Sequence, residues 1–225
     1  MLTREFTQAH YDADYEEDKI PLIQAVILLA FWYVDAEDRN GSWHWIGIAI
    51  SLGQTIGLHR SLSLESSRLL NRSKQRTSSI SGNHGRLWRL IWWTCYFRDT
   101  WLSFGVGRPT RINLSDCDTP IPTTSDVEAL LADASPAAAS KYFPPDTKTT
   151  LAQTWTCLME ATFALWRILK AHYKAKQQLR PPPIEAIDRD MKDLIRCRSA
   201  FPSEDSCDEG SVALVHLYHL HVYYE

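Results

Sequence analysis

The segment from His84 to Phe104, HGRLWRLIWWTCYFRDTWLSF, constrains the fold of this chain more than any other. Its apolar and aromatic residues fall on nearly every side of a helix instead of forming one stripe. A helix that is apolar all round is stable only when most of its surface is buried. We therefore predict a central helix that follows an N-cap at Asn83 and is buried on most sides.

The sequence after this helix, FGVGRPTRI, has two interpretations. A glycine-rich loop that binds phosphate follows a strand and opens a helix, whereas these glycines come after a helix. Gly105 and Gly107 stand where the end of a helix needs a residue free to adopt positive φ. Pro109 prevents the helix from continuing and disfavours helical backbone at Arg108. The position favours a helix stop with a sharp turn over a phosphate site.

Helical periodicity recurs along the rest of the chain. Pro21 suits the first turn of one such segment, and Ser42 is a candidate N-cap for the next. Alternation typical of a strand extends over no more than a few residues. The sequence thus predicts an all-α fold, an irregular multi-helix bundle or array, with further helices at residues 20–34, 42 to about 57, 126–132, 151–179, 184–198 and 211–224.

Two connections stand out by composition. Residues 61–83 are rich in Ser and Arg and predict a basic loop, and residues 119–150 contain several Pro and acidic residues and predict a long surface connection. Residues 1–19 form an acidic linker, and with 44% hydrophobic residues the remainder, 20–225, has enough apolar material for one domain. The last helix reaches Glu225 without a stop signal, so we expect the chain to be cut inside a helix of a larger protein.

Net charge, the length of the apolar runs and cysteine content argue against several classes of function. The formal net charge is −3, so the chain has no basic field of the kind that holds DNA through its phosphates. The longest apolar run, at 20–34, is shorter than the roughly 20 residues of a membrane span. The five Cys form no CxxC pair, and the N-terminus has no signal peptide, which favours a reducing intracellular compartment.

Motifs of catalysis and metal binding are missing from the sequence. It contains neither Gly-x-Ser-x-Gly nor His-Glu-x-x-His. Of His216, His219 and His221, only the first two share a helical face, and no Cys or carboxylate stands at a matching spacing. The acidic turn at 35–40 is the one trace of an all-α, isoprenoid-type enzyme, and it has no second acidic cluster. We predict no enzyme, with that enzyme class and a ligand-free protein-interaction scaffold as alternatives.

Charged residues interrupt the central helix at Arg89, Arg98 and Asp99. An unpaired charge in a core is costly, so each must find a partner or reach water. Arg98 and Asp99 are adjacent and cannot face each other on a helix. They either bond to other helices and their terminal carbonyls or form a ligand-sensing pair at a pocket. Arg108 and Arg111 have Asp116, Asp118 or the last helical carbonyls as candidate partners.

Three segments resemble the fungal-specific transcription factor domain, the regulatory middle region of zinc binuclear cluster regulators. They are WHWIGIAISLGQTIGLHRS, GRLWRLIWWTCYFRDTWLSFGVGRPTRINLSDCDTPIP and, more weakly, LVHLYHLHVYYE. The second is the most specific, since Trp-Trp-x-Cys-Tyr, Arg-Asp, Gly-Arg-Pro, Asp-Cys-Asp and Ile-Pro stand in the family's order. Among relatives, the resemblance is nearest to regulators of cutinase and of the fatty-acid response.

The resemblance implies a nuclear, effector-responsive domain that controls transcription by RNA polymerase II. The family's zinc cluster needs six closely spaced Cys, which this chain lacks, so zinc and DNA binding are expected only in a domain outside it. No cofactor and no membrane are expected for the chain itself. Transcriptional co-regulators and a small-molecule inducer are the implied partners, and a homodimer of the full-length protein is left open.

The family's signature residues describe a structural junction and not a catalytic site. We expect the Gly-Arg-Pro turn to fold the Asp-Cys-Asp segment back across the end of the central helix, so that Arg108 forms a buried ion pair with an acid there. Truncating Arg108 would then lower the melting temperature. The residues that carry the signature over are Trp88, Trp92, Trp93, Arg98, Asp99, Gly107, Arg108, Pro109, Asp116 and Asp118.

Overall fold

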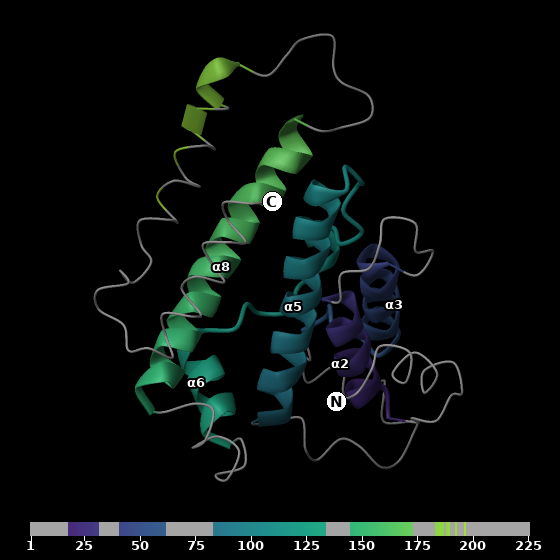
Figure 1. Ribbon diagram of the computed structural model, residues 1–225, viewed down its shortest axis with the longest axis vertical. Coiled ribbons are helices and arrows are strands. Elements are labelled where there is room, and N and C mark those ends of the chain that lie inside the picture. The colour runs from purple at the N-terminus through teal and green to yellow at the C-terminus, as the bar shows by residue number, and fades with distance from the viewer. Residues whose placement is uncertain are drawn as a thin grey trace. The chain divides into compact units, whose positions relative to one another are not determined.

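The computed structural model describes residues 18–31, 41–61, 83–133 and 145–172, with 183–186, 188, 189, 192 and 196. The regular elements in this part of the chain are all helices and include no strand, which confirms the all-α prediction (Figure 1). The chain divides into two compact units, Met1–Pro122 and Thr123–Glu225. The elements in order are α2 (Lys19–Ala30), α3 (Ser42–Thr55), α5 (Asn83–Gly105), the 3₁₀ turn η1 (Leu114–Asp116), α6 (Thr124–Asp133) and α8 (Pro145–His172).

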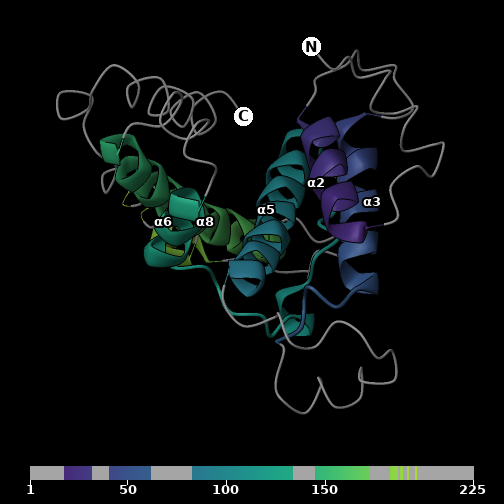
Figure 2. The same ribbon diagram turned by 90° about the horizontal axis from the view of Figure 1, so that it is seen from below.

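In the first unit α2 and α3 pack against each other, and both contact α5 (Figures 1 and 2). Their facing sides are apolar and almost fully buried, including Ile23 and Val26 of α2, Ile46 and Ile50 of α3, and Trp92 of α5. Burying one large apolar side chain stabilises the fold by about 1.5–3 kcal/mol. This core brings the ends of α2 and α3 against the middle of α5.

Local sequence sets the ends of α2. Asp18 is the N-cap, its carboxylate accepting a hydrogen bond from the Ile20 N–H at 3.1 Å, and Pro21 lies in the first turn as predicted. The helix ends at Ala30, earlier than the predicted Val34, because the Phe31 N–H turns back to the Leu28 carbonyl at 3.1 Å. Residues 32–34 lie outside the described part of the chain.

For α3 the sequence predicted the C-terminal end correctly and the N-cap wrongly. Gly41 is the N-cap, with extended backbone, and Ser42 is the first helical residue. Gly57 has a φ of +80° and donates to Gln54 at 3.0 Å, while the Leu58 N–H reaches the Gly53 carbonyl at 2.9 Å. This pair of bonds is a Schellman motif, which confirms that the helix stops at Gly57.

The central helix is present as predicted. From Ile91 to Ser103 every residue of α5 is buried except the half-buried Thr94. Asn83 is the first residue of the helix, so it is not the N-cap that the sequence predicted. The helix ends in a second Schellman motif, in which the Gly107 N–H reaches the Phe104 carbonyl at 3.2 Å and the Arg108 N–H reaches Ser103 at 2.9 Å.

The two glycines at this end have different roles. Gly107 has a φ of +63° and ends the helix, whereas Gly105 is its last helical residue and has no positive φ. The structure therefore places a helix stop here, and of the two candidate glycines only Gly107 supplies the left-handed backbone.

Gly107→Ala is expected to lower the free energy of unfolding by about 1–2 kcal/mol, because an L-residue is strained in left-handed backbone. Gly105→Ala is the matched control: a Cβ there meets nothing within 4 Å. Since Gly105 is helical, its replacement should raise stability by up to about 1 kcal/mol. Urea denaturation measures both, and equal effects of the two substitutions would contradict this assignment.

The second unit pairs α6 with α8. Thr123 and Asp126 cap α6 reciprocally: the Thr123 N–H donates to the Asp126 carboxylate at 3.0 Å, and the Asp126 N–H donates to the Thr123 hydroxyl at 3.2 Å. The short helix predicted at 126–132 is thus confirmed and slightly longer. A hydroxyl contact of 3.0 Å joins Thr124 to Thr156 of α8.

The long helix begins earlier than the periodicity indicated. It starts at Pro145 and not at Leu151, since Pro is well accepted in a first helical turn. Residues 145–150 therefore belong to α8 and not to the predicted surface connection. Within the helix predicted at 184–198, the described positions are helical, and Lys192 pairs with Asp188 at 2.6 Å.

Several predicted features lie outside the described residues. They are the loop at 61–83 apart from its ends, the acidic turn at 35–40, and the helix at 211–224 with His216, His219 and His221. Among the helices that are described, none is long and apolar enough to cross a membrane.

Candidate functional site

Arg98 and Asp99 lie side by side in the middle of α5, and both are fully buried, at 0% exposure. Burying either charge without a partner would cost several kcal/mol. Adjacent residues on a helix point in different directions, so each must find its own partner. In the structure the partner of Arg98 lies at the end of α2, and the partners of Asp99 lie in the segment that follows α5.

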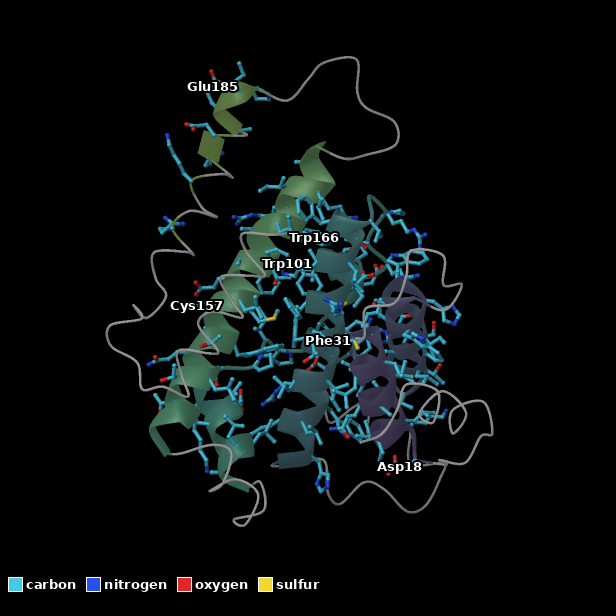
Figure 3. All side chains as sticks on the ribbon, viewed as in Figure 1. Asp18, Phe31, Trp101, Cys157, Trp166 and Glu185 are labelled. Carbon is cyan, nitrogen blue, oxygen red and sulfur yellow. The ribbon has the colours of Figure 1, made fainter. Side chains whose placement is uncertain are left out.

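Arg98 bonds to the end of α2. Its Nε and Nη2 atoms donate to the Ala30 carbonyl at 3.2 and 2.9 Å. Ala30 is the last residue of α2, where the unpaired carbonyls give a helix its negative end. The guanidinium also lies 4.4 Å from the centre of the Phe31 ring, which stacks on Phe97 of α5. Phe31 is labelled in Figure 3. Arg98 thereby ties the end of α2 to α5, as one of the two sequence interpretations proposed.

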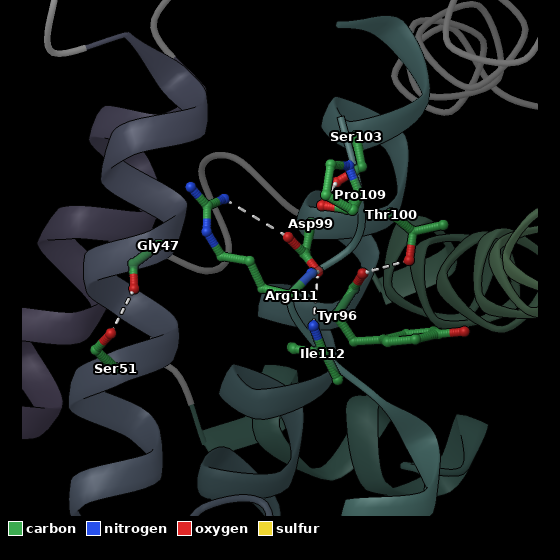
Figure 4. A network of polar contacts seen from close by, with 9 residues as sticks. All are labelled: Gly47, Ser51, Tyr96, Asp99, Thr100, Ser103, Pro109, Arg111 and Ile112. Carbon is green, nitrogen blue, oxygen red and sulfur yellow. Dashed lines mark hydrogen bonds and ion pairs between the residues drawn. The ribbon is translucent and has the colours of Figure 1, made fainter. Parts of the chain in front are cut away.

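Asp99 bonds to the segment that follows the turn, residues 109–120, which we call the strip. Its Oδ2 atom accepts the backbone N–H groups of Arg111 at 2.7 Å and of Ile112 at 3.0 Å. Its Oδ1 atom lies 3.7 Å from Nη1 of Arg111 (Figure 4). One buried carboxylate therefore holds the strip against α5 by two backbone bonds and one ion pair.

Burial and ion pairing have opposite effects on the pKa values of Asp99 and Arg111. Burial raises the pKa of the Asp99 carboxyl above its ordinary value, while the two backbone donors and the Arg111 charge act to lower it. Burial lowers the pKa of Arg111, against the opposing effect of Asp99. Each charge thus depends on the other to remain ionised inside the protein.

Arg111 extends from the strip to α3. Its guanidinium carbon lies 3.1 Å from the centre of the Trp43 ring, and the side chain runs toward Gly47 (Figure 4). A Cβ at Gly47 would lie 3.0 Å from that carbon, so only glycine leaves the guanidinium its full space. Arg98, Asp99, Arg111 and Trp43 together form what we call the junction, which joins α2, the strip and α3 to α5.

Gly47→Ala is expected to lower the free energy of unfolding by about 1–3 kcal/mol, because the new methyl group overpacks an Arg111 that Asp99 and Trp43 hold in place. Gly53→Ala, also in α3, is the control. A Cβ there would meet Leu58 and Trp92 at an ordinary 3.5 Å. Chemical denaturation compares the two, and a Gly47→Ala variant as stable as Gly53→Ala would show that the close approach to Arg111 is relaxed at no cost.

The strip also bonds to the segment after α3. The N–H groups of Asp118 and Thr119 reach the His59 carbonyl at 3.1 and 3.3 Å. The Asp118 carboxylate accepts the Ser61 N–H at 2.5 Å and lies 3.4 Å from Nε of Arg60. The end of the Asp-Cys-Asp segment is therefore fixed to the turn that follows α3.

The tryptophans of the signature divide between the core and this strip. Trp92 is buried against Gly53 of α3 and lies 5.7 Å from the His59 ring. Trp93 donates its indole N–H to the Pro120 carbonyl at 2.9 Å, which holds the far end of the strip. Trp88 is half-buried nearer the start of α5, and the described contacts of the junction do not include it.

The remaining signature residues form the turn. Gly107 ends α5, the Pro109 carbonyl accepts a hydrogen bond from the Ser103 hydroxyl at 3.3 Å, and Asp116 is exposed in η1. The Asp116 carboxylate accepts bonds from Ser115 at 3.2 Å and from Asn113 at 3.4 Å. Asp116 thus shapes its own turn, and it pairs with no arginine among the described residues.

Arg108 does not make the predicted buried ion pair. It is exposed, and its guanidinium lies 4.6 Å from the centre of the Trp43 ring. The pairing with an acid is made instead by Arg111, three positions further along, because the turn at 107–109 carries Arg108 outward and brings the strip's next residues back over Asp99. The sequence also did not identify Trp43 and Gly47 as functional residues. Their one signal was that both lie in WHWIGIAISLGQTIGLHRS, a segment that resembles the family.

Within the described ranges, no group of three His, Cys, Asp or Glu side chains could hold a metal ion. The junction itself consists of a cation on a helix end, a carboxylate on backbone amides and a cation on an indole. This arrangement fixes helix positions relative to each other.

Comparison with known proteins agrees with the resemblance seen in the sequence. The family model of the fungal specific transcription factor domain matches residues 2–180. Cutinase transcription factor 1 beta of Fusarium vanettenii is 36% identical over 171 residues, which cover 74% of this chain and 18% of that protein. Cutinase transcription factor 1 alpha of the same fungus is 32% identical over 120 residues, or 53% of this chain and 12% of that protein.

A further relative is the acetamidase regulatory protein of Aspergillus fumigatus, 32% identical over 121 residues, which cover 52% of this chain and 14% of that protein. The chain thus spans less than a fifth of the length of these relatives. No solved structure matches it. The family is one of transcription factors and not of enzymes, so the isoprenoid-type alternative is not favoured. With a family model that covers most of its length, this chain belongs to the fungal-specific transcription factor domain family.

Proposed function

We propose that this chain is the effector-responsive regulatory region of a zinc-cluster transcription factor that controls transcription by RNA polymerase II in the nucleus. Its family membership supports this, as do relatives named as transcription factors of cutinase and as an acetamidase regulatory protein. With a net charge of −3 the chain is poorly suited to hold DNA through phosphates. DNA contact and the zinc cluster would then lie in a separate domain.

The junction offers a way to transmit a signal. Arg98 and Asp99, neighbours on one helix, bond respectively to the end of α2 and to the strip. A movement of α5 therefore affects both bonds together. A small-molecule inducer or a co-regulator would shift such a unit only to the extent that it binds one arrangement better than the other. This pairing of two buried charges is the observation that supports regulation by conformational coupling.

The test is a reporter experiment with residues 1–225 fused to an unrelated DNA-binding domain. We expect the fusion to change reporter output relative to the DNA-binding domain alone, and candidate metabolites to alter that output. Arg98→Ala should abolish the response, while Gly105→Ala, at the open helix position, should preserve it. Immunoblots must establish equal protein levels.

Equal output from the fusion and from the bare DNA-binding domain, at equal protein level and with every metabolite, would contradict the proposal. A fusion that changes output but ignores all metabolites would instead favour a ligand-free scaffold for helical partners.

A further inference from the structure

Two guanidinium groups converge on one indole at the start of α3. The guanidinium carbon of Arg111 lies 3.1 Å from the centre of the Trp43 ring, and that of Arg108 lies 4.6 Å from it. Trp43 is in the first turn of the helix, after an N-cap, Gly41, that makes no side-chain cap bond. The two arginines come from the segment that follows α5 and the indole comes from α3, so two separate parts of the unit supply this cluster.

The charges of the cluster are not balanced within the described residues. Asp99 offsets one positive charge through Arg111, and it is buried beneath the strip. Arg108 is exposed, and its described contact is the neutral ring of Trp43. The first turn of α3 contains no acidic residue, and the N-terminus of a helix itself carries partial positive charge. The pKa of Arg111 is lowered mainly by burial, and the nearby charge of Arg108 adds to this.

We propose that Arg108 and Arg111, arranged over the Trp43 indole, bind the carboxylate or phosphate group of a small anionic ligand. A guanidinium presents a planar fork of donors that matches both groups and forms paired hydrogen bonds with them. Stacking on the indole orients both forks before the ligand arrives, which lowers the entropy lost on binding. The Arg111 side chain is 24% exposed, so a ligand at the surface reaches it without opening the core.

An anion at this position acts on the junction. The same Arg111 side chain that would contact the ligand faces Asp99 at 3.7 Å, and the Arg111 backbone N–H is bonded to Asp99 at 2.7 Å. A ligand that draws the guanidinium outward weakens the ion pair that holds the strip, whereas one that neutralises Arg108 relieves repulsion and strengthens it. That this site receives an effector rests on the proposed regulatory function, but the binding itself does not.

The test follows the indole N–H signal of Trp43 in ¹H–¹⁵N spectra of the 225-residue chain, assigned by Trp43→Phe. Sodium phosphate and sodium succinate are titrated separately at constant ionic strength, balanced with sodium chloride. We expect the signal to move in a saturable manner with at least one of the two anions, and the comparison separates phosphate from carboxylate recognition. Arg108→Gln should weaken that binding at least tenfold, and Arg108→Lys should weaken it less.

Arg167→Gln, an equal change of charge at an exposed position of α8, is the control and should leave the affinity unchanged. Shifts that grow linearly without saturation, or that are the same in Arg108→Gln and in the unmodified chain, would overturn the proposal. Because binding is measured on the isolated chain, its absence would leave the reporter test of regulation untouched.

Discussion

Asp99→Ala is expected to lower the free energy of unfolding by about 3–5 kcal/mol, the cost of breaking a buried charge pair by removing one partner. The substitution leaves the Arg111 guanidinium without its counter-charge and two backbone N–H groups, of Arg111 and Ile112, without an acceptor. Urea denaturation followed by tryptophan fluorescence measures the loss. Asp116→Ala is the control, since Asp116 is exposed and bonds only within its own turn among the described residues.

Asp116→Ala should change stability by no more than about 0.5 kcal/mol, as surface substitutions usually do. Asp99→Asn should fall between the two, because an amide oxygen still accepts backbone N–H groups but carries no charge for Arg111. Equal stabilities of the Asp99→Ala and Asp116→Ala variants would show that the strip is held by its other contacts.

The charge of Asp99 also predicts how pH modifies this result. Burial raises the folded-state pKa of the Asp99 carboxyl above its unfolded value of about 3.9, so the folded state favours the protonated carboxyl. The contribution of Asp99 to stability is therefore fully present below about pH 3.9 and declines as pH rises through the folded-state pKa, as proton linkage requires. Arg111→Met removes the cation that opposes the increase in the Asp99 pKa, so the folded-state pKa of Asp99 is higher still in this variant. The destabilisation by Arg111→Met should therefore be larger at pH 7 than at pH 4.5. In an Asp99→Asn background that difference should disappear.

Arg98→Ala is expected to cost about 3–5 kcal/mol, since it removes a buried side chain, creates a cavity and leaves a buried carbonyl without its donors. The lost partners are the Ala30 carbonyl, with two bonds, and the Phe31 ring. Hydrogen exchange should accelerate first in the last turn of α2. Arg98→Lys should recover only part of the loss, because a single ammonium cannot reproduce two donors in a plane.

Arg108→Ala is the matched comparison for Arg98→Ala. Arg108 is exposed and lies on an indole, so its removal should cost no more than about 1 kcal/mol. A cost for Arg108→Ala that equals the cost for Arg98→Ala would return Arg108 to the buried role that its place in the Gly-Arg-Pro motif first indicated.

The parts of the fold that sequence predicted depend on nearest neighbours along the chain. α5 was predictable because a segment that is apolar on all sides has no stable alternative to burial. Its end was predictable because Gly107 and Pro109 act on the backbone directly. The same local logic located α6 and the end of α3.

The partners of the buried charges could not be read in this way. Arg98 bonds to a carbonyl 68 positions away in sequence, and every helix offers such carbonyls at its end. Whether Arg108 or Arg111 reaches Asp99 depends on the path of the turn, which the φ of Gly107 sets and residue types alone do not. The start of α8 at Pro145 was missed because Pro has two meanings beside a helix. It prevents a helix from continuing, but it is also accepted in the first turn of a new helix.

Hydrogen exchange at the Arg111 and Ile112 amides tests most directly the claim that Asp99 holds the strip against α5. We expect these two amides to exchange as slowly as those of α5 in the unmodified chain. In Asp99→Ala, under conditions where α5 remains protected, they should exchange at the rate of an open loop. If the Arg111 and Ile112 amides already exchange at that rate in the unmodified chain, Asp99 does not hold the strip and the junction is not the structure described here.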